Sequence, residues 1–280
     1  MKKEIETIIE NLKEIRNDLT LEKKAYKLWL RELVVSAQKN GATDYGDFSA
    51  LFRKCEITEP AELVLCAKFL RREDLGNIHD DFSLENIDRL PYVVSNFCNS
   101  LSERTYDFFF GESDYKIIPR NSFGEIFDDI ANEKSNYCIA PIENNTTGTL
   151  GNFYQQIFDY GLKIVKVCDV LNADTDTETR FALLASAPIC LASIDEGEDL
   201  FEILIHSSDG SVLPRILEAA RICKMIPDRI DSVPLSSLKK EHPFKIVFKM
   251  LPDVSLTDFL IYLTLDGISY TPVGIFSTNE

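Results

Sequence analysis

The hydrophobic pattern from residue 199 to the C-terminus constrains the fold more than any other feature of this chain of 280 residues. Short runs of apolar residues and amphipathic segments follow one another in the order strand, helix, strand, strand, helix, strand. We expect the strands at 201–206, 229–235, 244–250 and 273–276 and the helices at 212–223 and 255–266. This order predicts an antiparallel sheet with two helices on one face.

Such an arrangement is a ferredoxin-like sandwich, and we expect it to form a C-terminal domain over residues 198–280. A small domain with an exposed sheet edge often pairs with a copy of itself. The sequence therefore predicts a homodimer or a larger homo-oligomer that assembles through this domain.

Between residues 91 and 190 short strands alternate with helices, which predicts a parallel α/β layer. The expected strands are 92–94, 115–118, 137–140, ended by Pro141, and 162–167, and the expected helices are 102–110, 122–131 and 151–160. Residues 1–90 read as helical, with segments at 5–15 and 28–39 and a helix from Pro60 to Leu70, before a charged connector at 71–91. The whole chain is expected to be a multidomain protein of mixed α+β and α/β class.

Composition excludes several classes of partner. The formal net charge of −16 repels phosphate backbones and anionic lipid, so we expect neither nucleic acid nor a membrane as partner. No apolar run reaches the length of a membrane span, and the N-terminal residues lack the apolar core of a signal peptide. Seven scattered cysteines and three scattered histidines predict reduced thiols, a cytoplasmic location and no metal site.

Two polar segments could hold a small anionic molecule. The first contains Glu143, Asn144, Asn145 and Thr146, directly after an expected strand. Side-chain hydroxyls and amides, together with backbone N–H groups, can bind carboxylates. The second is Thr179-Arg180-Phe181, which offers a hydroxyl and a guanidinium. The alternative interpretation is structural, because Asn and Thr are also common turn and cap residues and Thr179 could simply begin a strand.

The order of several short motifs resembles that of the prephenate dehydratase family. The stretch Ala140-Pro141-Ile142-Glu143-Asn144-Asn145-Thr146-Thr147-Gly148-Thr149-Leu150 is similar to a signature loop of that family. Phe110-Gly111-Glu112-Ser113, the segment 121–127 and Thr179-Arg180-Phe181 also resemble family motifs. The ferredoxin-like tail resembles the ACT regulatory domain that follows the catalytic part in these proteins.

The resemblance implies a carbon–oxygen lyase of L-phenylalanine biosynthesis, which converts prephenate to phenylpyruvate, carbon dioxide and water without a cofactor. It assigns proton relay to Thr179, orientation of the site to Arg180 and a wall of the site to Phe181, with residues 143–146 binding the substrate. In the tail it implies allosteric binding of phenylalanine. The residues that correspond to the phenylalanine-binding signatures are Gly210, Ser211, Val212, Asp231 and Ser232.

Three departures from the family pattern leave a second hypothesis open. Residues 96–102 contain no glycine where the family has a glycine-rich loop. Only residues 171–178 separate Val170 from Thr179, which leaves no room for the family's second lobe. Asp209 and Val233 replace a proline and an arginine of the ACT signatures. The alternative is a non-catalytic regulator or scaffold that binds an aromatic amino acid through the ACT-like domain, and a chorismate mutase role for residues 1–90 is disfavoured.

Overall fold

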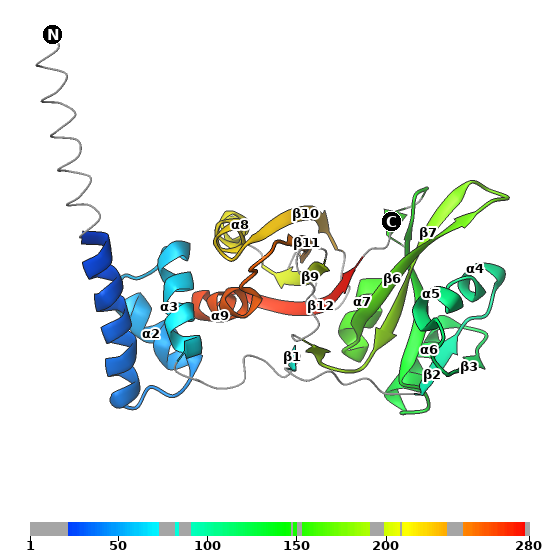
Figure 1. The fold of residues 1–280 in the computed structure, drawn as a ribbon, viewed down its shortest axis with the longest axis horizontal. Coiled ribbons are helices and arrows are strands. Elements are labelled where there is room, and N and C mark those ends of the chain that lie inside the picture. Colours follow the sequence, from blue (N-terminus) through cyan, green and yellow to red (C-terminus); the bar gives the residue numbers. More distant parts are fainter. Residues whose placement is uncertain are drawn as a thin grey trace, which may run out of the picture. The chain divides into compact units, whose positions relative to one another are not determined.

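The structure is a computed structural model that describes residues 22–72, 82–83, 91–146, 148–149, 153–190, 199–207, 209–233 and 243–277. The chain folds into two compact units (Figure 1). The smaller unit comprises Met1–Gly76 and Leu256–Gly267, and the larger comprises Asn77–Ser255 and Ile268–Glu280. The helix expected at 5–15 lies outside the described residues.

The smaller unit is helical in all the parts that the structure describes. A helix over 22–39 ends at Asn40 and Gly41, as expected, and Gly41 has a φ of 97°. It is followed by α2 (Tyr45–Lys54) and α3 (Pro60–Arg72). The sequence did not predict α2, which begins where the Asp44 side chain accepts a hydrogen bond of 2.8 Å from Asp47 N.

Helix α9 (Leu256–Asp266) belongs to this helical unit, although it is the second helix of the C-terminal strand-and-helix pattern. The Ser49 hydroxyl on α2 donates a hydrogen bond of 2.7 Å to the Leu265 carbonyl. On α3, Arg71 Nε lies 3.0 Å from the buried Asp258 carboxylate. The C-terminal segment therefore contributes a helix to the core of the N-terminal unit.

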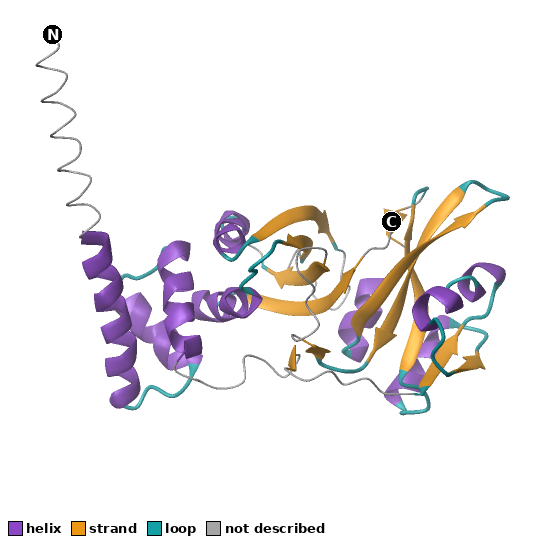
Figure 2. Ribbon diagram, viewed as in Figure 1, coloured by secondary structure: helices purple, strands orange, loops and turns teal. Residues whose placement is uncertain are grey.

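One mixed sheet runs through the larger unit, shown as the orange arrows in Figure 2. Its strands lie in the order β10-β11-β9-β12-β6-β7-β4-β2-β3, with β5 (Gly148–Thr149) paired to β4. A separate pair joins β1 (Phe82–Ser83) to β8 (Ile189–Cys190). The expected mixed α/β class is confirmed.

The ferredoxin-like half of this sheet consists of β9 (Asp199–His206), β10 (Met225–Ser232), β11 (Phe244–Met250) and β12 (Ser269–Ser277), with α8 (Val212–Ile222) between β9 and β10. Its strands are antiparallel, and the predicted order of strands and helices is confirmed. The second strand begins at Met225 rather than at the predicted Arg229. Lys224, with a φ of 67°, turns the chain directly from the end of α8 into the strand.

The other half, which we call the lobe, consists of β2 (Tyr92–Asn96), β3 (Tyr115–Pro119), β4 (Tyr137–Asn144), β6 (Lys163–Asn172) and β7 (Thr177–Ala185). The strands β2, β3 and β4 are parallel, as predicted, whereas β7 is antiparallel to both β4 and β6. Helices α6 (Phe123–Ala131) and α7 (Phe153–Tyr160) contribute to one apolar core cluster, and α5 (Tyr106–Phe110) contributes to another.

Two predictions about the lobe were wrong in detail. The helix expected at 102–110 is two short helices, α4 (Ser100–Glu103) and α5, because Asn99 and Ser102 form a capping box three residues before the expected start. Strand β4 does not end at Pro141 but continues to Asn144. A bulge between Pro141 and Glu143 accommodates the residue that has no N–H to donate.

Within the sheet, the lobe and the ferredoxin-like half are joined by one parallel strand pair, β6 with β12. Gly274 on β12 is paired with Ile164 on β6, and both strands carry an irregularity beside this pair. A Cβ atom on Gly274 would lie 2.5 Å from the Ile164 carbonyl oxygen, so only glycine fits without a shift of the backbone. In the described part of the chain, no helix combines the length and the apolar character that a membrane span requires.

Candidate functional site

Three charged side chains meet where β4, β7 and β6 lie side by side. Glu143 and Asp169 are both paired in register with Arg180, from the two neighbouring strands. Arg180 donates from Nε and Nη2 to the two oxygens of Asp169, each at 2.9 Å, and from Nη1 to Glu143 at 3.3 Å. The guanidinium of the T-R-F motif is therefore held between two carboxylates.

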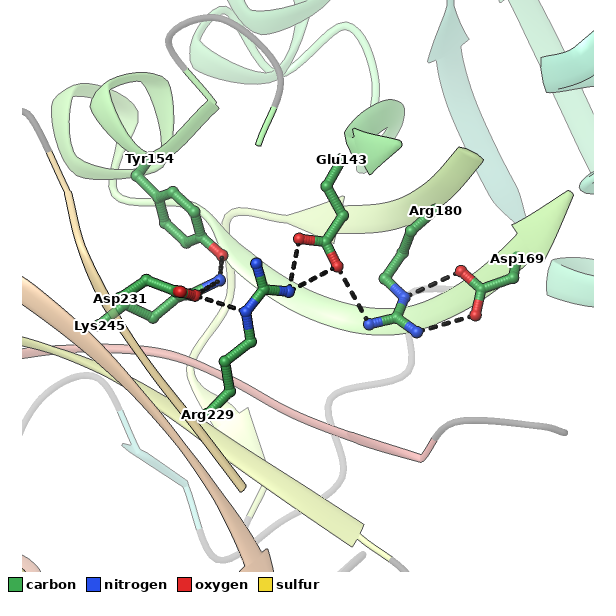
Figure 3. Close-up of polar contacts among 7 residues, drawn as sticks. All are labelled: Glu143, Tyr154, Asp169, Arg180, Arg229, Asp231 and Lys245. Atoms are coloured by element: carbon green, nitrogen blue, oxygen red, sulfur yellow. Dashed lines mark hydrogen bonds and ion pairs between the residues drawn. The ribbon is translucent and has the colours of Figure 1, made fainter. Parts of the chain in front are cut away.

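A second arginine reaches Glu143 from the ferredoxin-like half. Arg229 on β10 contacts both Glu143 oxygens from Nη1, at 2.9 and 2.7 Å, and its Nε lies 2.6 Å from Asp231. Asp231 is in turn 3.3 Å from the Lys245 ammonium on β11. Figure 3 shows the resulting row of side chains, which we call the ionic chain: Asp169, Arg180, Glu143, Arg229, Asp231 and Lys245.

The ionic chain ends at a buried group of side chains beneath Lys245. The ammonium donates a hydrogen bond of 2.8 Å to the Tyr154 hydroxyl on α7 and lies 4.9 Å from the centre of its ring. Tyr154 is also hydrogen-bonded to Glu202 on β9. Burial raises the pKa of the Tyr154 hydroxyl well above its ordinary value, and burial also raises the pKa of Glu202.

The carboxylates keep both guanidiniums firmly charged. The pKa of Arg180 is raised, mainly by its hydrogen bonds to Asp169. Partial burial pulls the pKa of Arg229 down, but Glu143 and Asp231 outweigh it and the pKa is raised. Neither arginine is a free anion receptor, because each already faces two carboxylates.

A surface pocket of about 240 Å³ lies over this row. Its lining contains three carboxylates and two guanidiniums, from Glu143, Asn144, Asn145, Gly148, Asp169, Glu178, Arg180 and Arg229. The turn that follows β4, at Asn145 and Thr146, is called the pocket loop. Asn145 holds this loop against β7, because its N–H donates to the Glu178 carbonyl at 3.0 Å and its side-chain oxygen accepts from Glu178 N at 3.2 Å. Asn144 accepts from Thr146 N at 3.1 Å, which is a local turn bond.

The three residues of the T-R-F motif point to different surroundings. Only Arg180 lines the pocket, because successive side chains of a strand point to opposite faces. Thr179 is buried, and Phe181 is buried in the core cluster that includes Leu183 and Tyr137. The register nevertheless brings the two predicted segments together, with Thr179 opposite Asn144 and Arg180 opposite Glu143.

The predicted regulatory residues are divided between two places. Gly210, Ser211 and Val212 lie at the start of α8, where Asp209 accepts hydrogen bonds from Ser211 N at 2.8 Å and from Ser211 Oγ at 2.7 Å. These bonds lower the pKa of Asp209. Ser232 ends β10, and Asp231 beside it belongs to the ionic chain.

Three backbone N–H groups of the segment that replaces the family's glycine-rich loop are bonded to side chains of the same segment. The Asn99 side chain accepts from Leu101 N at 3.0 Å and from Ser102 N at 2.9 Å, and Asn99 N donates to the Ser102 hydroxyl at 3.1 Å. Asn96 donates to the Tyr106 hydroxyl at 2.7 Å. These N–H groups are engaged within the loop and are not directed at a ligand.

Sequence reasoning missed Arg229, Lys245, Tyr154 and Glu202. A signal was present for two of them, because Lys245 and Glu202 interrupt strands that are otherwise strongly apolar, and a charge inside such a strand needs a partner. No comparable signal marks Arg229 on its exposed strand. Within the described residues, no group of three or more His, Cys, Asp or Glu side chains could hold a metal ion.

Comparison with known proteins finds sequence and structural similarity to prephenate dehydratases. Residues 99–171 match the family model described as prephenate dehydratase. No curated protein sequence matches the chain. A prephenate dehydratase of Streptococcus mutans shares the fold, with a TM-score of 0.54 and 18% identity over 68% of this chain and 100% of that one.

Two further solved structures share the fold. A quorum-quenching acylase, GqqA, has a TM-score of 0.51 and 13% identity over 67% of this chain and 95% of its own. A prephenate dehydratase of Arthrobacter aurescens in complex with L-Phe has a TM-score of 0.50 and 11% identity over 66% of this chain and 89% of its own. Residues 99–171 are therefore similar in sequence to the prephenate dehydratase family, and this chain has a fold that solved prephenate dehydratases share.

Proposed function

We propose that this chain is a cytoplasmic relative of prephenate dehydratases that binds an aromatic amino acid and acts as a regulator, without converting prephenate. The observation that carries this proposal is the ion pairing of the candidate pocket. Both of its guanidiniums are engaged by carboxylates, and the lining contains one more carboxylate than guanidinium.

Prephenate is a dicarboxylate, so it needs cationic or hydrogen-bond-donating anchors that are free to receive it. In this pocket its carboxylates would face Glu143, Asp169 and Glu178. Two carboxylates about 5 Å apart repel each other by roughly 3 kcal/mol at an effective dielectric constant of about 20. The pocket is therefore poorly suited to a dianion.

The surroundings of the pocket support the same proposal. The N–H groups of Asn99, Leu101 and Ser102 are engaged in the capping box and its turn. The segment between β6 and β7 is a tight hairpin turn at residues 173–176, where the family places a second lobe. Without a second lobe opposite it, the pocket neither encloses a substrate nor excludes water.

The ligand and assembly are proposed by analogy. The Arthrobacter aurescens relative is described in complex with L-Phe, and the C-terminal pattern of this chain resembles an ACT domain. We assign the ligand to Gly210, Ser211, Val212, Asp231 and Ser232 and assembly to a homodimer through this domain. By sequence the chain would comprise a helical domain at 1–90, a dehydratase-like lobe at 91–190 and an ACT-like domain at 198–280.

A second candidate function is that of an active prephenate dehydratase, a lyase that needs no cofactor. The specific observation in its favour is the register that sets Asn144 opposite Thr179 and Glu143 opposite Arg180. Catalysis would then depend on a proton relayed by Thr179, with a second wall supplied by another subunit or by residues 1–90.

The deciding experiment measures phenylpyruvate formed from prephenate by the full-length wild type and by Thr179→Ala. We expect both to match the rate of prephenate breakdown in buffer alone. Turnover in the wild type that disappears in a folded Thr179→Ala variant would establish the lyase and overturn our proposal.

The regulator role has its own test, in which the melting temperature is measured with phenylalanine, tyrosine, tryptophan and prephenate. We expect an aromatic amino acid to raise it, since a ligand at 100 times its Kd stabilises the folded state by about 2.7 kcal/mol. The rise should be lost in Gly210→Leu and retained in Gly124→Ala, a matched control on α6. No rise with any aromatic amino acid would contradict the role.

A further inference from the structure

Glu202 is a buried acid in an otherwise apolar strand. Its residue is only 4% exposed, between Phe201 and Ile203 in the centre of β9. One of its carboxyl oxygens, Oε1, is enclosed by protein and has no hydrogen-bond partner in the part of the chain that the structure describes. A carboxylate in such a position is expensive, whereas a neutral carboxylic acid is tolerated.

The polar groups around Glu202 come from four other elements. Tyr154 on α7 is its hydrogen-bond partner, and the charges of Glu143 on β4 and of Arg229 on β10 act on it. On β11, Val247 is the residue directly opposite Glu202. Lys245 lies two residues earlier on β11 and therefore on the same face, as a diagonal neighbour. Lys245 is 3% exposed and is shared between Tyr154 and Asp231.

The charges of the ionic chain balance without Glu202. Three cations, Arg180, Arg229 and Lys245, face three carboxylates, Asp169, Glu143 and Asp231. An ionised Glu202 would add a fourth negative charge to this set. Burial and the nearby Glu143 oppose that charge and outweigh the attraction of Lys245 and Arg229, so the pKa of Glu202 is raised.

We propose that Glu202 is a proton switch: protonated, it leaves the Lys245 ammonium with Asp231, and when it loses its proton to solvent it takes that ammonium. Asp231 then loses a partner, and the contacts of Arg229 are redistributed. Since Arg229 holds both oxygens of Glu143, the ionic chain relays the change to the pocket loop. A buried group more than one strand away from the pocket thereby sets how firmly the loop is held.

The test compares the full-length wild type with Glu202→Gln, which keeps the shape of the neutral acid, and with Glu112→Gln as a control at an exposed position outside the pocket. Stability is measured by urea unfolding across a series of pH values. A carboxyl whose pKa is raised on folding contributes stability that is complete below its unfolded pKa, about 4.3, and lost as the pH rises through the folded value.

We expect the folding equilibrium constant of the wild type, divided by that of Glu202→Gln, to fall by up to about tenfold per pH unit above that point. The same fall should be absent from the ratio for Glu112→Gln, because that variant leaves Glu202 in place. A pH-independent ratio for Glu202→Gln overturns the proposal.

The relay requires a second, local readout. The amide signals of Asn145 and Glu178, which are hydrogen-bonded across the pocket loop, should titrate with Glu202 in the wild type and become silent in Glu202→Gln. Silent amides in the wild type overturn the relay. If Glu202→Gln fails to fold, a carbon-13 titration of the wild-type side-chain carboxyls decides, because a Glu202 signal that titrates with the ordinary glutamates contradicts a buried neutral acid.

Discussion

Two of the places where the lobe and the ferredoxin-like half of the larger unit contact each other differ in their physics. At the backbone joint, Gly274 on β12 lies against Ile164 on β6 with no space for a side chain. At the ionic joint, Arg229 on β10 grips both oxygens of Glu143 on β4, and its side chain remains 41% exposed. The first joint depends on shape and the second on charge.

This difference separates what must be constant from what can be adjusted. Close backbone contact is insensitive to pH and salt, and it tolerates little change of volume. Ion pairs that reach water are individually weak and respond to salt and protonation. The backbone joint therefore sets the architecture, and the ionic joint can tune the pocket without unfolding the protein.

The largest effect is expected from Gly274→Ala. The new Cβ would lie 2.5 Å from the Ile164 carbonyl oxygen and 2.8 Å from its Cβ, so both strands must shift. We expect a loss of about 2–3 kcal/mol in the free energy of unfolding, measured with urea. Gly124→Ala is the control, because its nearest neighbour is 4.0 Å away. Equal stability of the two variants would show that the strand pair is not required.

Much of the fold could be predicted from local pattern. The β-α-β-β-α-β order, the start of α3 at Pro60, the Ser122 cap of α6, and the two polar segments on β4 and β7 all follow from hydrophobic period and turn chemistry. Gly274 could not be singled out, because its requirement arises only from pairing with Ile164, far away in the sequence. Helix α9 was predicted as a helix, but its place in the helical unit depends on packing against α2 and α3.

The candidate site was predicted in its parts and not in its connections. Glu143 and Arg180 were both expected at a site, and Asp231 was expected at a different, regulatory one. Arg229, which links Glu143 with Asp231, is 86 residues from Glu143 in the sequence and is not itself part of any motif. Ionic contacts of this kind depend on tertiary register, which a single sequence does not reveal.

A smaller effect is expected at the ionic joint, from Arg229→Ala. After this change Glu143 is still paired with Arg180 and Asp231 is still paired with Lys245, so each carboxylate keeps one cationic partner. Because Arg229 is well exposed, water screens part of the loss, and we expect about 1–2 kcal/mol. The difference from wild type should shrink at high salt. Arg221→Ala, on the exposed side of α8, is the control. An equal loss of unfolding free energy in both variants would show that Arg229 contributes no more to stability than an ordinary surface arginine.

The smallest expected effect, which distinguishes the two joints most sharply, is how the stability lost through Gly274→Ala and through Arg229→Ala depends on pH. Gly274→Ala removes no charge. Although Gly274 is paired with Glu202 on β9, we therefore expect the stability lost through Gly274→Ala to change less with pH than the stability lost through Arg229→Ala. The charge of Arg229 lowers the pKa of Glu202, so Arg229→Ala should raise that pKa further. Above the wild-type pKa the wild type has no more stability to lose from Glu202, whereas the variant continues to lose it. The loss caused by Arg229→Ala should therefore grow with rising pH, as measured by parallel urea titrations, and it should stop growing when Glu202→Gln is added. If the stability lost through Arg229→Ala stayed constant with pH, Arg229 would not influence the titration of Glu202, and the ionic joint would have a structural role alone.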